Sequence, residues 1–208
     1  MSITLNANND GSGSVQTGGI DAIQISAAQN VTVPNNLTVT NASTFTGNVS
    51  GVLKSGTAVA STSGTSIDFT GIPATAKRIT VMFSGVSINI NGIITVQIGG
   101  GSPTTSGYAG LAVKWDNGGG GSVNLSNGFN VQGYNGGSGD IVNGILTIAN
   151  LSGNTWTASG SCGPSDGNNK FWMVAGSVTI GATLDRVRIT TVGGTATFDL
   201  GTVNIMWE

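Results

Sequence analysis

The sequence predicts an all-β protein in which an N-terminal extended arm and a repetitive β-stalk precede an antiparallel β-sandwich. Three observations support this prediction. Only 8% of the 208 residues are charged, against about 25% in a typical soluble domain, and β-branched and small polar residues take their place. Gly occurs 35 times, which is typical of a chain with many tight turns. No long stretch has the apolar spacing of a helix.

The stalk is predicted from a six-residue repeat over Asn30–Gly51. In the first unit Val31 and Val33 lie two positions apart, which puts both on one face of a short strand. Leu37 and Val39 repeat this spacing in the second unit. An Asn, Pro or Gly closes each unit with turn chemistry. A fixed short period of this kind is typical of a repeat architecture.

One copy of this repeat has too few apolar side chains to offset the backbone entropy that it loses on folding. Its strand edges would also stay open to other chains. We therefore expect identical copies to wind together around a three-fold axis as a homotrimer. The alternative interpretation is a loosely ordered N-terminal tail on a monomer.

Three regions follow from these patterns: an arm at residues 1–29, the stalk at residues 30–56 and a head at residues 57–208. The arm begins with a possible strand at Ser2–Asn6, and an apolar alternation returns near Ile20. Extended segments add strands to exposed sheet edges, so we expect the arm to dock on another protein. The alternative is a poorly ordered terminus.

The head is predicted to be a β-sandwich of jelly-roll type, built from short antiparallel strands. Asn91-Gly92 between two apolar runs predicts a two-residue hairpin, and Gly118–Gly121 predicts a loop. The expected strands are Thr57–Ala60, Ser66–Phe69, Arg78–Ser84, Val86–Ile90, Ile93–Ile98, Tyr108–Lys114, Val123–Gln132, Ile141–Ile148, Thr155–Gly160, Lys170–Ile180, Arg186–Val192, Thr195–Leu200 and Thr202–Trp207. The expected core is Ile79, Val81, Phe83, Ile94, Val96, Ile98, Leu146, Ile148, Val174, Val178, Ile180, Val187, Ile189, Phe198, Val203 and Ile205.

The composition excludes several functional classes. The net charge is −2 with no basic patch, so no nucleic-acid partner is expected. No apolar run reaches the ~18 residues of a membrane span and no signal peptide is apparent, so we expect assembly in the cytoplasm without membrane insertion. There is no histidine, which removes the commonest metal ligand and general base. We expect no metal site and no cofactor.

No enzymatic activity is expected. Hydrolysis of a polysaccharide needs two carboxyl groups about 5–10 Å apart, one of them with a raised pKa. Glu208 is the single Glu, and the Asp residues are scattered without a paired spacing. Cys162 lacks a histidine partner for nucleophilic catalysis. No catalytic residue is assigned.

Aromatic residues beside polar loop residues are the candidates for ligand binding, because sugar rings stack on aromatic faces while their hydroxyls bond to Asn, Asp and Ser. The candidate binding residues are Tyr108, Trp115, Asp116, Asn117, Tyr134 and Asn135. Trp115 and Tyr134 abut glycine-rich loops, where binding surfaces usually lie; packing is the alternative for both. Trp156, Trp172 and Trp207 lie within strands and are assigned to the core or a trimer interface.

Several stretches carry a family resemblance. They are Asn36–Thr40 followed by Phe45–Val49 in the stalk, and Ser66–Pro73, Lys77–Gly85, Leu184–Thr191 and Thr197–Ile205 in the head. Together they resemble the stalk repeats and C-terminal domains of bacteriophage tail-fibre proteins, over roughly residues 30–208. The resemblance implies a trimeric virion component with a host-recognition head, and it names no binding site.

The resulting hypothesis is a structural virion fibre protein, located in the phage tail and assembled in the host cytoplasm, that attaches to the host surface through a cell-surface glycan. Three weak sites on one stalk would raise the apparent affinity by avidity. Two other classes stay open. One is a capsid decoration or cement protein, and the other is a polysaccharide-degrading tailspike.

Overall fold

The computed structural model describes residues 3–7, 12–17, 20–25, 31–32, 53–133, 136–165 and 169–208. The chain divides into two compact units, Met1–Thr46 and Gly47–Glu208. Every regular element among the described residues is a β-strand, and all strand pairs are antiparallel. The prediction of an all-β antiparallel protein is therefore confirmed. In this part of the chain no helix long and apolar enough to span a membrane is found.

The first unit contains a small four-stranded sheet in sequence order. Its strands are β1 (Ile3–Ala7), β2 (Gly13–Thr17), β3 (Ile20–Ile25) and β4 (Val31–Thr32). The sequence predicted one extended arm at residues 1–29, and this differs from the structure because neighbouring segments satisfy one another's backbone groups. Residues 33–52, which include most of the predicted stalk repeat, lie outside the described residues.

The second unit is built from two antiparallel sheets. The nine-stranded sheet has the order β12-β11-β16-β15-β14-β8-β18-β5, with β6 also pairing with β18. The five-stranded sheet has the order β10-β9-β17-β7, with β13 pairing with β9. The bounds are β5 (Lys54–Ser55), β6 (Val59–Ala60), β7 (Ile67–Thr70), β8 (Arg78–Ile88), β9 (Ile94–Gly100), β10 (Ser102–Pro103), β11 (Ala109–Asp116), β12 (Gly119–Asn124), β13 (Phe129–Asn130), β14 (Val142–Ser152), β15 (Thr155–Pro164), β16 (Phe171–Thr179), β17 (Arg186–Thr191) and β18 (Phe198–Trp207).

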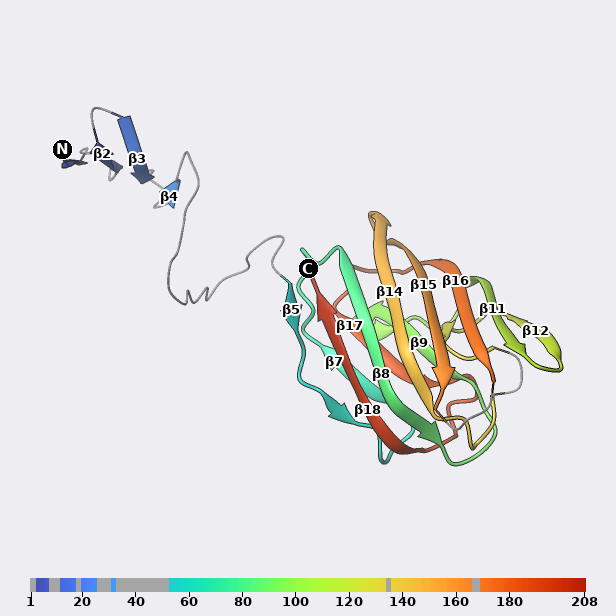
Figure 1. The fold of residues 1–208 in the computed structure, drawn as a ribbon. Coiled ribbons are helices and arrows are strands. Elements are labelled where there is room, and N and C mark those ends of the chain that lie inside the picture. Colours follow the sequence, from blue (N-terminus) through green and yellow to red (C-terminus); the bar gives the residue numbers. More distant parts are fainter. Residues whose placement is uncertain are drawn as a thin grey trace. The chain divides into compact units, whose positions relative to one another are not determined.

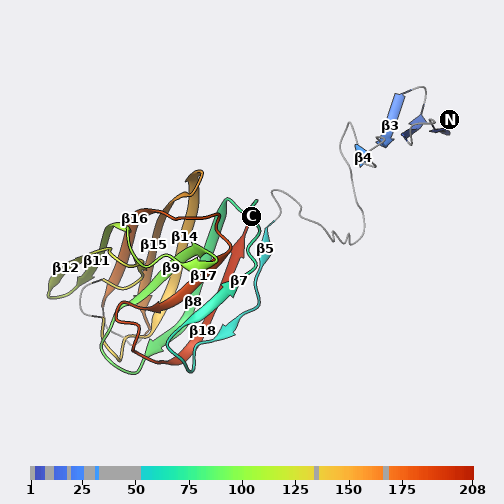
Figure 2. The ribbon, with the colours of Figure 1, turned by 180° about the vertical axis from the view of Figure 1, so that it is seen from behind.

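The two sheets form two layers, and the core lies between them. The nine-stranded sheet is in front in Figure 1, and β7, β9 and β17 come to the front in Figure 2. Alternate residues of β8 such as Ile79 and Val81 are fully buried, while Arg78 and Ser84 on the other face are exposed. All the core residues expected from the sequence are buried, which confirms that prediction.

The predicted hairpin at Asn91-Gly92 is wrong. β8 pairs with β14 and β18, whereas β9 pairs with β10, β13 and β17, so this turn carries the chain from one sheet to the other. The polar groups of this turn form hydrogen bonds with the loop that contains Gly136 and Ser138, and they do not pair two strands of a hairpin. Asn91 Oδ1 accepts a hydrogen bond from Ser138 N at 3.0 Å, and Gly92 N donates to Gly136 O at 3.1 Å.

Two pairs of predicted strands are joined into single long strands. β8 contains Gly85 and joins the predicted strands Arg78–Ser84 and Val86–Ile90. β18 contains Gly201 and joins the predicted strands Thr195–Leu200 and Thr202–Trp207. Both glycines have positive φ values, 67° and 96°, which glycine adopts without a Cβ clash. The pairing of β18 with β8 shifts register in this region, so the glycines allow irregular strands to continue.

The predicted loop Gly118–Gly121 is largely strand. β12 begins at Gly119 and pairs with β11, so the two strands form a hairpin. Trp115 lies opposite Gly120 in this ladder, and a Cβ on Gly120 would be 3.9 Å from the Trp115 ring. The glycines therefore extend the β11 ladder without adding side chains beside the indole.

Candidate ligand-binding surface

The β11–β12 hairpin presents the most exposed aromatic residue among the described residues. Trp115 near the end of β11 has 69% of its surface exposed. It lies opposite Phe171 at the start of β16, which is also exposed. Burial alternates along both strands, with Ala112 and Trp172 inside. Both exposed rings therefore lie on the outer face of the nine-stranded sheet.

A polar pocket of about 320 Å³ lies at the same end of the sheet. It is lined by Asp116, Asn117, Gly118, Asn169 and Lys170. Asp116 and Asn117 follow Trp115 in the hairpin, while Asn169 and Lys170 precede Phe171. The pairing of β11 with β16 thus brings two segments more than fifty residues apart in sequence to one site.

Two ion pairs set the charge of this pocket. Lys114 Nζ lies 2.8 Å from Asp116 Oδ2, and Gly118 N donates to Asp116 Oδ1 at 3.0 Å. The hydrogen bond from Lys114 is the main reason that the pKa of Asp116 is lowered. Lys170 Nζ lies 2.6 Å from Oδ1 of the buried Asp140. An ionised carboxylate and two amides therefore border the pocket as hydrogen-bonding groups for hydroxyls.

Tyr108 does not belong to this surface, which corrects the sequence-based prediction. Its ring is buried and contacts Phe129 edge-to-face at a centroid distance of 4.9 Å. Its hydroxyl accepts a hydrogen bond from Ile98 N at 2.9 Å. Burial raises the pKa of Tyr108 to about 12. Tyr108 is therefore a core residue.

The other predicted aromatic positions divide between core and undescribed segments. Trp156 and Trp172 are buried in the core, and Trp207 packs partly buried against it. Tyr134 and Asn135 lie outside the described residues, so their assignment stays a prediction. Cys162 is buried too, and burial raises its thiol pKa to about 12.

Sequence reasoning did not assign Asn169, Lys170 or Phe171 to the site. A signal was present, because Phe171-Trp172 opens an alternating segment and only one of two consecutive aromatics can face the core. The missing information was which strand lies beside β11.

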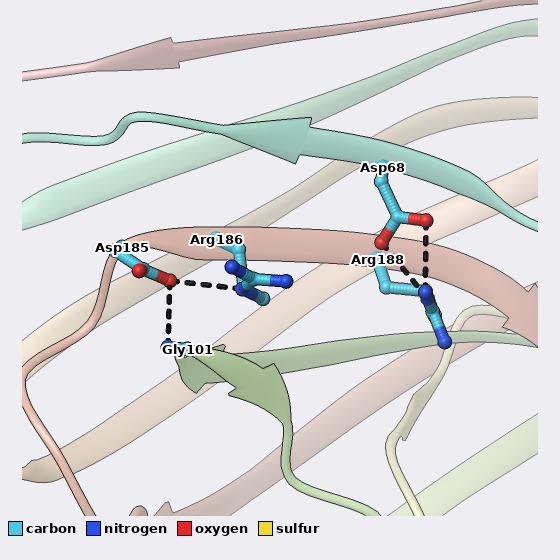
Figure 3. Close-up of polar contacts among 5 residues, drawn as sticks. All are labelled: Asp68, Gly101, Asp185, Arg186 and Arg188. Carbon is cyan, nitrogen blue, oxygen red and sulfur yellow. Dashed lines mark hydrogen bonds and ion pairs between the residues drawn. The ribbon is translucent and has the colours of Figure 1, made fainter.

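A second polar pocket, of about 300 Å³, lies on the five-stranded sheet. Arg188 on β17 is opposite Gln97 on β9 and Asp68 on β7. Figure 3 shows Arg188 bonded to Asp68 and Arg186 bonded to Asp185. The lining residues are Thr65, Ser66, Gln97, Thr105, Asn127, Arg188, Thr190, Thr191, Val192, Gly193 and Gly194. No motif in the sequence pointed to this pocket.

Within the described ranges, no three Cys, Asp or Glu side chains gather closely enough to form a metal site. No protein-family model matches the chain, and no curated protein or solved structure shows a significant similarity to it. The site and the sequence patterns are therefore the observations on which a function can be argued.

Proposed function

We propose that this chain is a homotrimeric fibre protein of a bacteriophage virion, and that its C-terminal unit attaches to a glycan on the host surface. The observation that carries the binding proposal is the position of Trp115. Its exposed indole lies opposite Phe171, and the two residues that follow it, Asp116 and Asn117, line a polar pocket at the same end of the sheet.

This combination fits a saccharide better than a purely apolar ligand. A sugar ring has C–H faces that stack on an indole, and hydroxyls that bond to carboxylate and amide groups. A large aromatic side chain exposed to water is an apolar surface that a partner can cover. Trp is also a common anchor residue in protein interfaces because it buries much area with few rotatable bonds.

The architecture of a fibre supports the rest of the proposal. The six-residue repeat of Asn30–Gly51 supplies a stalk that needs partner copies to cover its apolar face, and the N-terminal unit supplies the tail-docking element. β7, β8 and β9 alternate between the two sheets, as consecutive strands of a jelly-roll head do. Three heads on one stalk give three sites that bind with avidity.

The charge of Asp116 favours adhesion over hydrolysis. A glycoside hydrolase needs one carboxyl group with a raised pKa, so that it is protonated and can donate a proton to the leaving group. The pKa of Asp116 is lowered instead, chiefly by its hydrogen bond from Lys114. Asp116 therefore accepts hydrogen bonds from hydroxyls and does not serve as a general acid.

The test is binding of the full-length chain to an array of bacterial cell-surface saccharides. We expect Trp115→Ala to weaken binding to the recognised saccharide at least about tenfold, equivalent to about 1.4 kcal/mol. Leu151→Ala is the matched control, because Leu151 is 68% exposed but lies outside the site. Equal binding by Trp115→Ala and the parent chain would remove Trp115 from the proposed site.

Two further measurements test the virion assignment. Electron microscopy of the particle with a labelled chain should place it at the tail; repetition across the capsid shell would indicate a cement protein. Incubation with the bound polysaccharide should release no oligosaccharides. Released fragments would identify a degrading spike and overturn the adhesion mechanism.

A further inference from the structure

The outer face of the nine-stranded sheet carries a row of side chains across five neighbouring strands, and all of them except a serine on β15 are apolar. Val113 on β11 is opposite Met173 on β16, and Met173 is opposite Ser161 on β15. Ser161 in turn is opposite Ile145 on β14, which is opposite Met82 on β8. We call these five residues the apolar row. The face that carries it is turned toward the viewer in Figure 1.

The row is open to water in a single copy of the chain. Met173 is 53% exposed and Ile145 is 49% exposed. Leu111, two positions along β11 from Val113, is exposed as well. Their neighbours in sequence, Trp172 and Leu146, point the other way and are buried. Solvated faces of antiparallel sheets normally carry polar side chains, so this row departs from the usual pattern.

The surroundings of the row are uncharged. On β11, β14, β15 and β16 the alternate residues that share the face of Val113, Ile145, Ser161 and Met173 are all apolar, hydroxyl or amide side chains. The nearest charged residue on this face of β8 is Arg78, the first residue of that strand, which is paired with Glu208. Four adjacent strands thus present a face without a formal charge.

We propose that the apolar row is the surface through which the C-terminal units of this chain contact one another. The occupant is a second copy of the same chain, and the proposal rests on the homotrimer proposed above. The inference specifies which surface of the C-terminal unit forms the interface within that homotrimer. Trp115 and Phe171 lie beyond the row, at the hairpin end, and remain in the ligand site.

Charge is the first argument for another copy as the occupant. Around a three-fold axis, a residue near the axis meets its own counterparts from the other subunits. A charged residue there would repel itself, whereas Met, Ile and Val gain from the contact. A neutral face therefore suits contact between identical chains.

Exposure and shape are the second argument. Met173, Ile145 and Leu111 are each at least 40% exposed on this face of the sheet, and apolar side chains that gather on a surface often mark a site of protein contact. Ser161 lies between the larger Met173 and Ile145 in the register, so a side chain from another copy can pack above the small serine.

The test uses oxidation of Met173 by hydrogen peroxide, because thioether oxidation depends on exposure. The full-length chain is treated at a concentration where its assembly state has been fixed by native mass spectrometry, and Met173 oxidation is followed by peptide mapping. We expect Met173 to react about tenfold more slowly in the parent chain than in the Ile145→Glu variant, whose carboxylate would keep the faces apart.

Leu200→Glu is the matched control, since Leu200 is 48% exposed and lies on β18 outside the row. It should leave the Met173 rate unchanged. A homotrimer in which Met173 oxidises equally fast in the parent chain and in Ile145→Glu would overturn this inference and leave the fibre proposal standing. A monomeric parent chain would overturn the homotrimer itself.

Discussion

Arg188 and Asp68 are joined by two parallel hydrogen bonds across neighbouring strands. Nε donates to Oδ1 at 2.8 Å and Nη2 donates to Oδ2 at 2.9 Å. The two residues are directly opposite in the pairing of β17 with β7. This two-point geometry is stronger than a single contact, and it raises the pKa of Arg188. The pair therefore links β7, which lies at one edge of the five-stranded sheet, to its neighbour β17.

Asp68→Ala should lower the free energy of unfolding by about 0.5–1 kcal/mol, because both side chains are about one-third exposed and water screens the pair. Thermal unfolding followed by circular dichroism measures the change. Thr70→Ala, an exposed position on the same strand, is the control. A double-mutant cycle with Arg188→Ala should show coupling; fully additive effects would contradict the pairing.

Gly201→Ala should destabilise the second unit strongly, because Gly201 lies within β18 where that strand approaches β8 closely. A Cβ at this position would lie 2.3 Å from Gly85 O, and φ is 96°. Gly194→Ala is the matched control, since its φ is 68° but nothing lies within 4 Å of the added Cβ. We expect Gly194→Ala to lower the free energy of unfolding by about 1–2 kcal/mol and Gly201→Ala to lower it clearly more. Urea unfolding measures both changes. Equal losses of stability would mean that β8 and β18 can move apart to accept the added Cβ without a further loss of free energy.

The ion pair of Asp185 should make stability depend on acid pH. Arg186 Nε and Gly101 N both bond to Asp185 Oδ1, and the Arg186 bond is the main cause that lowers the pKa of Asp185 below 3.8. A carboxylate with a lowered folded-state pKa stabilises the fold above its unfolded-state pKa, and this contribution is lost as the pH falls through the folded-state value.

The melting temperature of the parent chain should therefore exceed that of Asp185→Asn at neutral pH, and the difference should disappear as the pH falls below the lowered pKa of Asp185 in the folded chain. Melting curves across this range measure the effect. Asp185 is exposed to solvent, so added salt should reduce the difference. A difference that stays constant down to the lowest pH would show that the carboxylate charge is not responsible.

Tyr108→Phe should destabilise the second unit by about 1–3 kcal/mol, because Ile98 N would lose its acceptor in a buried place. The ring and its contact with Phe129 would remain. Chemical denaturation measures the change, and ultraviolet titration of the parent chain should show that Tyr108 ionises only near its raised pKa of about 12. An unchanged stability would indicate that water replaces the hydroxyl.

Local patterns predicted burial well and pairing poorly. Alternation in segments such as Ile79–Phe83 identifies the buried face, because period-two spacing is a property of one strand. The sheet that a strand joins depends on distant partners. Asn91-Gly92 has the composition of a hairpin turn, yet Ile88 and Ile94 on either side of it belong to different sheets and are both buried between them.

In the candidate site, too, residues adjacent in sequence were predictable, whereas residues brought in by strand pairing were not. Trp115, Asp116 and Asn117 could be predicted together because they are adjacent in sequence, whereas Asn169 and Lys170 reach the pocket only through the pairing of β11 with β16. Tyr108 illustrates why residue type alone does not decide between ligand binding and packing. A tyrosine whose hydroxyl meets a backbone amide is satisfied inside the core.

The attachment of β5 and β6 to β18 has a mechanical consequence. Beyond Leu53 the chain is held by short ladders to Trp207 and Val203 and by a bond from Gly56 N to Ile205 O at 2.8 Å. Tension applied at Leu53 opens these contacts one after another, as in a zipper, and not all at once. This releases about eight residues, or roughly 26 Å of chain, before the load reaches β7 and its ladder with β17. The second unit is therefore linked to the preceding chain by a segment that can lengthen under load before its sheets are disrupted.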